Sequence, residues 1–276
     1  MKKFENIVLA SDMDGTFLAG NEEGMARNRK AVAYFKSQGG HFTFCTGREP
    51  EAVLSVVPDT AELVNLPVVT CNGACLYDFA RGGEVERQGI PYEVVREFFQ
   101  VLDATGAETD VSAVTEKGVL LRKITVPYMA RSFCRMVQRG SRYAIRPVEQ
   151  WGEVYIYRMA VVGEPEDITR LLPFLRERFQ GKLELSRSYA HMIDIQTAGC
   201  TKATRLESVI RSEFDRPMYL VAVGDYGNDL EMLRLSDLAC CPDNAAPEVK
   251  AVCRGQFCHS EKGVIGDIME YLERIL

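Results

Sequence analysis

The 276-residue chain is expected to fold as an α/β protein, with a doubly wound parallel sheet core and an inserted α+β unit. Three observations lead to this prediction. Short apolar runs alternate with helical stretches towards both ends of the chain, as in parallel sheets that are covered on both faces. Three of these runs end in small polar or acidic residues. The middle of the chain has a different pattern, in which strand pairs alternate with single helices.

The first apolar run, residues 7–10, predicts a buried strand that leads into Asp12 and Asp14. The carboxyl ends of parallel strands lie where open α/β sheets bind ligands. Two carboxylates brought together there repel each other and raise each other's pKa unless a cation holds them. Gly15 supplies the backbone freedom for a tight turn after them. We therefore expect this segment to have a role in catalysis or binding, although the pattern Asp-x-Asp-Gly alone also suits a plain polar turn.

The elements expected up to residue 81 are a helix over 26–37, a strand over 42–45, a short helix from residue 50, a strand over 66–71 and a returning strand over 74–77. The pair Gly39-Gly40 ends the first helix. Asn72-Gly73, between the last two strands, is a strong signal for a two-residue hairpin turn. Residues 81–83 (Arg-Gly-Gly) are expected to form a hinge or linker.

The inserted unit is predicted to span residues 82–190. Its expected elements are a helix over 92–104, strands near 108–114 and 118–124, a helix over 127–138, a strand over 155–162, a helix over 164–179 and a strand over 182–188. Two strand pairs with two or three helices make an α+β module. The predicted domains are therefore 1–81 and 191–276, which form the core, and 82–190, which forms the insertion.

The core is expected to resume with a strand over 191–195, a helix from residue 202 to about 211, a strand over 218–223, a helix over 229–235, a strand over 237–241 and a C-terminal helix ending at 276. Thr201 is a suitable N-cap for the helix that begins at Lys202. The strand over 218–223 ends in a second acidic cluster with Asp225 and Asp229. Because the carboxyl ends of parallel strands meet at one edge of a sheet, we expect both acidic clusters and Thr46 to converge.

Four ordered groups of residues resemble the motifs of the haloacid dehalogenase (HAD) superfamily phosphatases, and most closely those of the Cof-like branch. The groups are Asp12-Met13-Asp14-Gly15-Thr16, Thr46-Gly47-Arg48, Lys202 and residues 224–233. The resemblance spans nearly the whole chain and implies a Rossmann-like core with an inserted C2-type cap. One departure is Ala203, where the family usually has Gly after the lysine. Ala is the better helix former, so we expect a firmer helix start and no change in the lysine's role.

The resemblance also implies roles for single residues. Asp12 would be the covalent nucleophile that forms an aspartyl-phosphate, and Asp14 the general acid and then the base. Mg²⁺ is the implied cofactor, and carboxylate oxygens suit it. Its ligands would be the Asp12 and Asp225 side chains and the Asp14 backbone carbonyl, with Asp229 orienting metal-bound water. The phosphate-binding residues would be Thr46, Gly47, Asn72, Lys202 and Asn228.

Some assignments have open alternatives. Asp229 also suits the ordinary role of an acid at a helix N-terminus, and Arg48 suits either a phosphate contact or a surface salt bridge. Candidates for substrate specificity in the cap are Arg187, Ser188, Tyr189 and His191. A lone histidine is more often structural than substrate-binding, so His191 is the weaker of these candidates.

The net charge of −6 argues against a nucleic-acid partner and requires that any anion binding be local. The odd number of cysteines, nine, argues against a framework of disulfides, and Cys253, Cys258 and His259 do not complete a zinc-binding pattern. Reduced thiols and the lack of a signal peptide favour the cytoplasm. No apolar stretch approaches the roughly 20 residues that a membrane helix needs.

These inferences predict a Mg²⁺-dependent phosphatase that hydrolyses small phosphorylated metabolites, with sugar phosphates as the expected class. A phosphomutase on the same site is one alternative. A non-catalytic phospho-ligand sensor is another, and the loss of Asp12 or Asp14 would favour it, but both residues are present. No oligomeric state is predicted.

Overall fold

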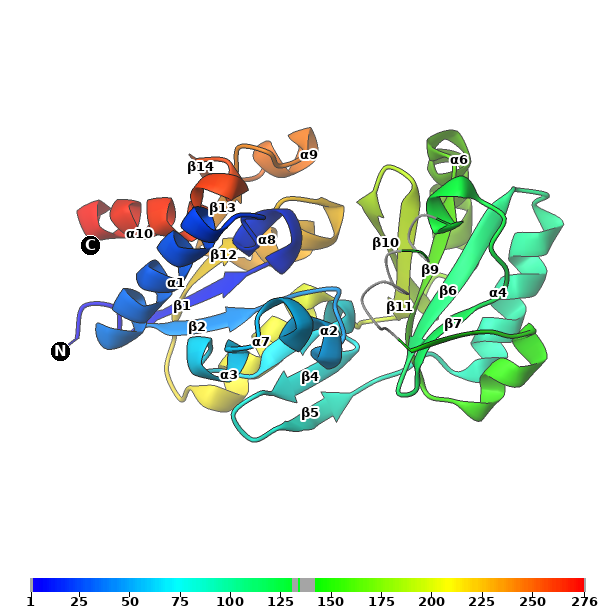
Figure 1. Cartoon of the computed structure of the whole chain (residues 1–276), viewed down its shortest axis with the longest axis horizontal. Coiled ribbons are helices and arrows are strands. Elements are labelled where there is room, and N and C mark those ends of the chain that lie inside the picture. The colour runs from blue at the N-terminus through cyan, green and yellow to red at the C-terminus, as the bar shows by residue number, and fades with distance from the viewer. Residues whose placement is uncertain (1, 131–133, 135–141, 276) are drawn as a thin grey trace. The chain divides into compact units, whose positions relative to one another are not determined.

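The computed structural model describes residues 2–130, 134 and 142–275 (Figure 1). They form two compact units, of which the first comprises Met1–Glu86 with Thr201–Leu276, and the second comprises Arg87–Cys200. The helix predicted over 127–138 is helical at 127–130, and most of its remainder lies outside the described residues. Within the described chain, no helix combines the length and the apolar character needed to cross a bilayer.

A parallel sheet in the order β14-β13-β12-β1-β2 forms the centre of the first unit. Its strands are β1 (Ile7–Ser11), β2 (His41–Phe44), β12 (Tyr219–Val223), β13 (Leu238–Pro242) and β14 (Gly255–Phe257). β1 pairs with β12 from Ile7↔Tyr219 and with β2 from Val8↔His41. The two strands beside β1 are therefore those that lead into Thr46 and Asp225, and all three carboxyl ends share one edge.

Helices cover both faces of this sheet, which makes it doubly wound as predicted (Figure 1). They are α1 (Glu22–Ser37), α2 (Pro50–Val56), α3 (Thr60–Leu63), α7 (Lys202–Glu213), α8 (Leu230–Leu235), α9 (Pro247–Lys250) and α10 (Val264–Ile275). Ile7 and Leu9 pack in one buried cluster with α1 and α10. Val8 and Ala10 pack in another with α7 and α8. This burial on both faces explains why β1 is apolar at every position from 7 to 10.

A small antiparallel sheet of β3 (Val68–Thr70), β4 (Cys75–Asp78) and β5 (Gly83–Arg87) also begins in the first unit. Two predictions are wrong here. Thr70 pairs with Cys75, so four residues form the turn between β3 and β4 instead of two. The amides of Cys71 and Asn72 donate to the carbonyls of Arg48 and Thr46, both at 2.9 Å, and this anchorage widens the turn. Residues 81 and 82 of the expected linker lie in the tight turn between β4 and β5, and Gly83 is the first residue of β5.

The second unit has a six-stranded sheet in the order β10-β11-β9-β6-β7-β8. Its elements are α4 (Tyr92–Ala104), β6 (Thr109–Thr115), β7 (Gly118–Leu121), β8 (Tyr143–Ile145), β9 (Ile156–Gly163), α6 (Pro165–Arg178), β10 (Leu183–Tyr189) and β11 (Met192–Thr197). The β7–β8 pair is parallel and the other pairs are antiparallel. Apolar side chains from β6, β9, β10 and β11 form one buried cluster with α4 and α6.

The predicted return to the core at residue 191 differs from this division. Residues 191–195 were expected to form a strand of the core sheet, but β11 pairs with β9 and β10 in the second unit. Ile193 and Ile195 pack towards α4 and α6, and Asp194 forms an ion pair with Arg158 of β9 at 2.6 Å. These contacts keep the segment in the second unit, and the chain re-enters the first unit at Thr201.

Candidate active site

Asp12 lies at the carboxyl end of the central strand β1 and is 5% exposed. Its amide donates to the carbonyl of Val223 at 2.9 Å, which extends the β1–β12 ladder by one residue and fixes the backbone. The Oδ1 atom of Asp12 accepts a hydrogen bond from Nζ of Lys202 at 2.6 Å. A buried, fixed carboxylate beside a buried ammonium group is therefore present where the sequence predicted a nucleophile.

Lys202 is the first residue of α7, and Thr201 caps that helix by accepting from the amide of Thr204 at 3.2 Å. Nζ of Lys202 also donates to Oδ1 of Asp229 at 2.8 Å. Burial alone would lower the pKa of Lys202, but Asp12 and Asp229 outweigh that effect and raise it. The lysine is thus held as a cation at the first position of a capped helix.

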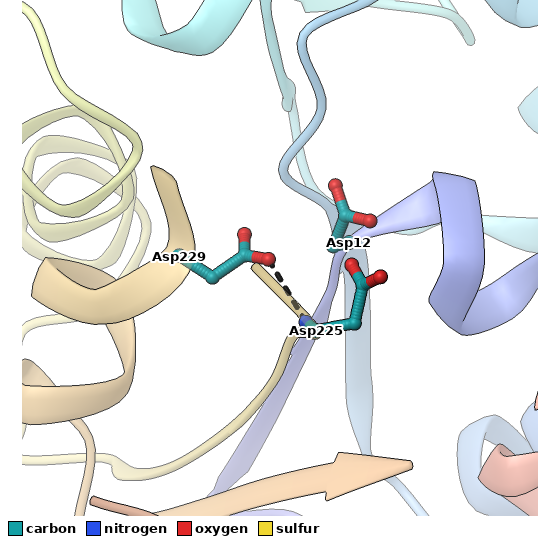
Figure 2. Close-up of side chains that lie close together, drawn as sticks. All are labelled: Asp12, Asp225 and Asp229. Carbon is teal, nitrogen blue, oxygen red and sulfur yellow. Dashed lines mark hydrogen bonds between the residues drawn. The ribbon is translucent and has the colours of Figure 1, made fainter. Parts of the chain in front are cut away.

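Asp229 uses both carboxylate oxygens within the protein. Oδ1 accepts from Lys202, and Oδ2 accepts from the amides of Asp225 and Tyr226 at 3.0 and 3.3 Å. Figure 2 shows the bond to the Asp225 amide and the carboxylates of Asp12 and Asp225 close to each other. Asp229 therefore orients the lysine and the loop that carries Asp225.

Ligand oxygens of Asp12, Asp225 and Asp229 lie within 4.8 Å of one another. Burial, and then repulsion by Asp229, raises the pKa of Asp225 to about 7. Burial also raises the pKa of Asp12 well above its usual value, although Lys202 opposes the shift. Hard carboxylate oxygens that are too close to ionise together suit a small divalent cation. The donor set therefore fits Mg²⁺.

The carboxylate of Asp14 does not join this cluster. It accepts two hydrogen bonds from Arg48, at 2.7 Å from Nε and 2.6 Å from Nη2. Paired bonds of this kind fix both distance and orientation. The Arg48 side chain is 17% exposed and that of Asp14 is 40% exposed, so Arg48 forms a salt bridge at a partly exposed position. A contact between Arg48 and phosphate remains a prediction.

The other predicted phosphate-binding residues form a second group at the same edge. Thr46 is fully buried, and its carbonyl accepts from the amide of Asn72 at 2.9 Å. Oδ1 of Asn72 accepts from Nδ2 of Asn228 at 3.2 Å. A Cβ on Gly47 would lie 3.1 Å from Oδ1 of Asn72, so the lack of a side chain lets these two segments approach. Thr46, Gly47, Asn72 and Asn228 thus come together. Convergence was predicted from strand ends for the Thr46 segment and the loop of Asn228, whereas for Asn72 it was implied by the family resemblance alone.

Comparison with known proteins identifies the family. The sequence profile of haloacid dehalogenase-like hydrolases matches residues 9–269. The chain belongs to this family. It is 24% identical over 244 residues to the HMP-PP phosphatase of Serratia proteamaculans, covering 88% of this chain and 86% of that protein.

Solved structures of similar fold align with nearly the whole length of this HAD-like chain. SMU.1108c from Streptococcus mutans has a TM-score of 0.82 at 20% identity, over 97% of this chain and 98% of that one. The HAD subclass IIB sugar phosphatase BT4131 has a TM-score of 0.80 at 20% identity, over 97% and 99%. The predicted fold, a doubly wound parallel core with an inserted α+β cap, and the predicted class of HAD-type phosphatase are confirmed.

The candidate specificity residues of the cap lie in the β10–β11 hairpin. Arg187 donates to the carbonyl of Tyr189 at 3.3 Å, and Ser188 donates to the carboxylate of Asp194. The rings of Tyr189 and His191 are stacked, with planes 8° apart and centroids separated by 5.7 Å. All four residues thus have structural contacts within the cap, and a role in substrate binding remains a prediction.

Sequence reasoning missed two residues that hold the site together. Arg205, on α7, donates to the carbonyl of Gly73 at 2.9 Å and so ties the Asn72 turn to the helix of Lys202. Asn244 donates from Nδ2 to the carbonyl of Gly15 at 2.7 Å. Asn244 is the second residue after β13, so the rule that polar residues gather at strand ends would have found it. No sequence signal pointed to Arg205.

Proposed function

We propose that this HAD-like hydrolase is a Mg²⁺-dependent phosphatase that works through an aspartyl-phosphate on Asp12. The observation that carries the proposal is the Asp12–Lys202 contact of 2.6 Å at the end of the central strand. A lysine held as a cation beside a carboxylate reduces the repulsion between that carboxylate and an incoming phosphoryl group.

Mg²⁺ would be held by Asp12 and Asp225, with Asp14 contributing its backbone carbonyl and Asp229 orienting the site. When bound, the ion supplies positive charge that neutralises the carboxylates and the transferring phosphoryl group. Asp229 is the least suited of the four to direct coordination, because both of its oxygens already accept hydrogen bonds. Thr46, Gly47, Asn72, Lys202 and Asn228 would bind the phosphoryl oxygens.

In the first step an oxygen of Asp12 forms a bond to phosphorus while the ester bond to the leaving alcohol breaks, and Asp14 gives that alcohol its proton. In the second step water attacks the phosphorus, its proton passes to Asp14, and the bond to Asp12 breaks. This returns both carboxyl groups to their starting states and releases inorganic phosphate. Arg48 holds Asp14 in place through the two bonds described above.

Small phosphorylated metabolites are the proposed substrates, with sugar phosphates first. The similarity of fold to a subclass IIB sugar phosphatase supports this choice, and the similarity to HMP-PP phosphatases adds HMP-PP to the substrates to be tested. The inserted cap is proposed to choose among them, since the core residues gathered around Asp12 suit a phosphate group and little beyond it.

The test is phosphate release from a panel of sugar phosphates and HMP-PP by wild type, Asp12→Asn and the control Asp243→Asn. Asp243 has an exposed side chain outside the carboxylate cluster. Its substitution therefore makes the same Asp-to-Asn change at a position that has no part in the proposed mechanism. We expect Mg²⁺-dependent release by wild type and by the control, inhibition by Ca²⁺, and none by a folded Asp12→Asn protein. Undiminished release by Asp12→Asn, or by wild type after exhaustive chelation, would rule out the mechanism.

A further inference from the structure

The loop between β13 and α9 contacts both halves of the carboxylate cluster, although it contributes no carboxylate to it. Nδ2 of Asn244 donates to the carbonyl of Gly15 at 2.7 Å, in the turn that carries Asp12 and Asp14. Two residues further on, the amide of Ala246 donates to the carbonyl of Asp225 at 2.9 Å. One short loop is therefore bonded to the backbone of both acidic segments.

Asn244 is itself held from its other side. Its Oδ1 atom accepts from the amide of Ser260 at 2.9 Å, so the side-chain amide is a bridge with one bond at each end. Because both ends are bonded, the amide plane cannot rotate without breaking one of them. The Gly15 carbonyl is thereby fixed relative to the loop and, through Ala246, relative to Asp225.

The position of Gly15 matters because its backbone packs directly on the Asp225 carboxylate. A Cβ built on Gly15 would lie 2.3 Å from Oδ2 of Asp225. Thr16, the next residue, has its hydroxyl 3.4 Å from Oδ1 of the same carboxylate. A shift of the Gly15 peptide therefore changes the space in which the Asp225 carboxylate sits, and with it the gap to Asp12.

We propose that Asn244 is a positioning residue for the cation site, which sets the separation between the Asp12–Gly15 turn and Asp225. The proposal rests on the proposed function, because it assumes that this cluster binds a divalent cation. Asn244 touches neither the cation nor the substrate in this role. Its effect is to make the cluster geometry ready for a small ion that tolerates little variation in ligand distance.

The experiment compares Mg²⁺ binding by calorimetry, and thermal unfolding without Mg²⁺, for wild type, Asn244→Asp, Asn244→Ala and the control Asp243→Asn. Asn244→Asp keeps the acceptor for the Ser260 amide and removes the donor to Gly15, whereas Asn244→Ala removes both. We expect both variants to bind Mg²⁺ about three- to tenfold more weakly, the value of one hydrogen bond. The control should match wild type.

Charge cannot explain this expected result. The carboxylate introduced by Asn244→Asp would attract a cation, so weaker binding by that variant must come from the disturbed contact with Gly15, where an acceptor oxygen replaces the donor and faces the Gly15 carbonyl. The half-saturating Mg²⁺ concentration for phosphate release should rise in each variant by the same factor as its Mg²⁺ dissociation constant.

Mg²⁺ affinity unchanged in both variants, with a lower unfolding temperature only, would show that Asn244 is a structural bridge and overturn the inference. Weaker binding by Asn244→Ala alone would assign the effect to Ser260 and also overturn it. If wild type binds no divalent cation, the metal dependence in the proposed function fails, and the inference fails with it. These outcomes are distinct.

Discussion

Substituting Gly15 by alanine should separate the cost of backbone strain from the cost of disturbing the cation site. Gly15 has φ +76°, a left-handed conformation, and faces the Asp225 carboxylate. Gly20 has nearly the same φ, +72°, but no atom lies within 4 Å of the Cβ that alanine would add. Gly20→Ala is therefore a matched control that carries the strain without the contact.

The expected magnitudes follow from these two environments. A left-handed alanine costs about 1–2 kcal/mol of the free energy of unfolding, and both variants should lose this amount. In Gly15→Ala the new methyl would also lie 2.3 Å from Oδ2 of Asp225, whereas ordinary contact begins near 3.4 Å, so the carboxylate must move by about 1 Å and the free energy of unfolding should fall further than in Gly20→Ala. A displacement of that size at a catalytic centre can cost roughly 100-fold in rate.

The assays are urea unfolding, Mg²⁺ calorimetry and kcat/KM for phosphate release. Both variants should be destabilised, Gly15→Ala at least as much as Gly20→Ala, while Gly15→Ala alone should lose Mg²⁺ affinity and about two orders of magnitude in kcat/KM. Equal kcat/KM in the two variants would refute the reasoning, since it would mean that Asp225 can move away from the methyl group without any effect on the site.

Three further predictions concern pH, Arg48 and the cap. Since the Asp225 pKa is raised to about 7, its contribution to the stability of the metal-free protein is full below the unfolded value of 3.8 and is lost as pH rises through 7. Protons also compete with Mg²⁺, so the dissociation constant from calorimetry should rise about tenfold per pH unit below 7 and level off above it, and a flat profile would contradict the assignment. Arg48→Ala should lower kcat about tenfold or more for alkyl phosphates and less for p-nitrophenyl phosphate, because Asp14 would lose its orientation and only poor leaving groups need its proton. Equal losses of kcat for the two kinds of substrate would count against this role of Arg48. Excision of 87–200 with a Gly/Ser linker should leave a soluble core with p-nitrophenyl phosphatase activity. The protein that lacks 82–188 should instead aggregate, because this deletion removes β5 and leaves β11 without partners. Gel filtration distinguishes the two outcomes, and a soluble 82–188 deletion would speak against the observed boundary.

The chain itself contains enough information to predict which residues of the site converge, but not how their side chains pair. Asp12, Thr46 and Asp225 each follow a buried strand, and the geometry of parallel sheets then brings them to one edge. The bond between Arg48 and Asp14 joins residues 34 positions apart, and nothing in the spacing of either residue selects the other as its partner. The same holds for Arg205 and the carbonyl of Gly73, since a helical arginine has many carbonyls within reach.

For β11, which was predicted to belong to the core sheet and lies in the cap sheet, the hydrophobic pattern of the sequence does indicate the correct unit. A strand in the middle of a covered parallel sheet is apolar at successive positions, as residues 7–10 of β1 are. Residues 192–197 instead place Asp194 between two isoleucines and Gln196 after the second, an alternation typical of antiparallel sheets with one apolar face. Both polar side chains are buried, and Asp194 is compensated by Arg158 from the neighbouring strand, so the alternation reflects two different buried faces. For β11, the alternation indicates a cap strand more clearly than the glycines at 82 and 83 do, and it places the return to the core after residue 197, where Thr201 caps the helix that begins at Lys202. The signal is specific to this strand, since β9 of the cap is continuously apolar over residues 159–162.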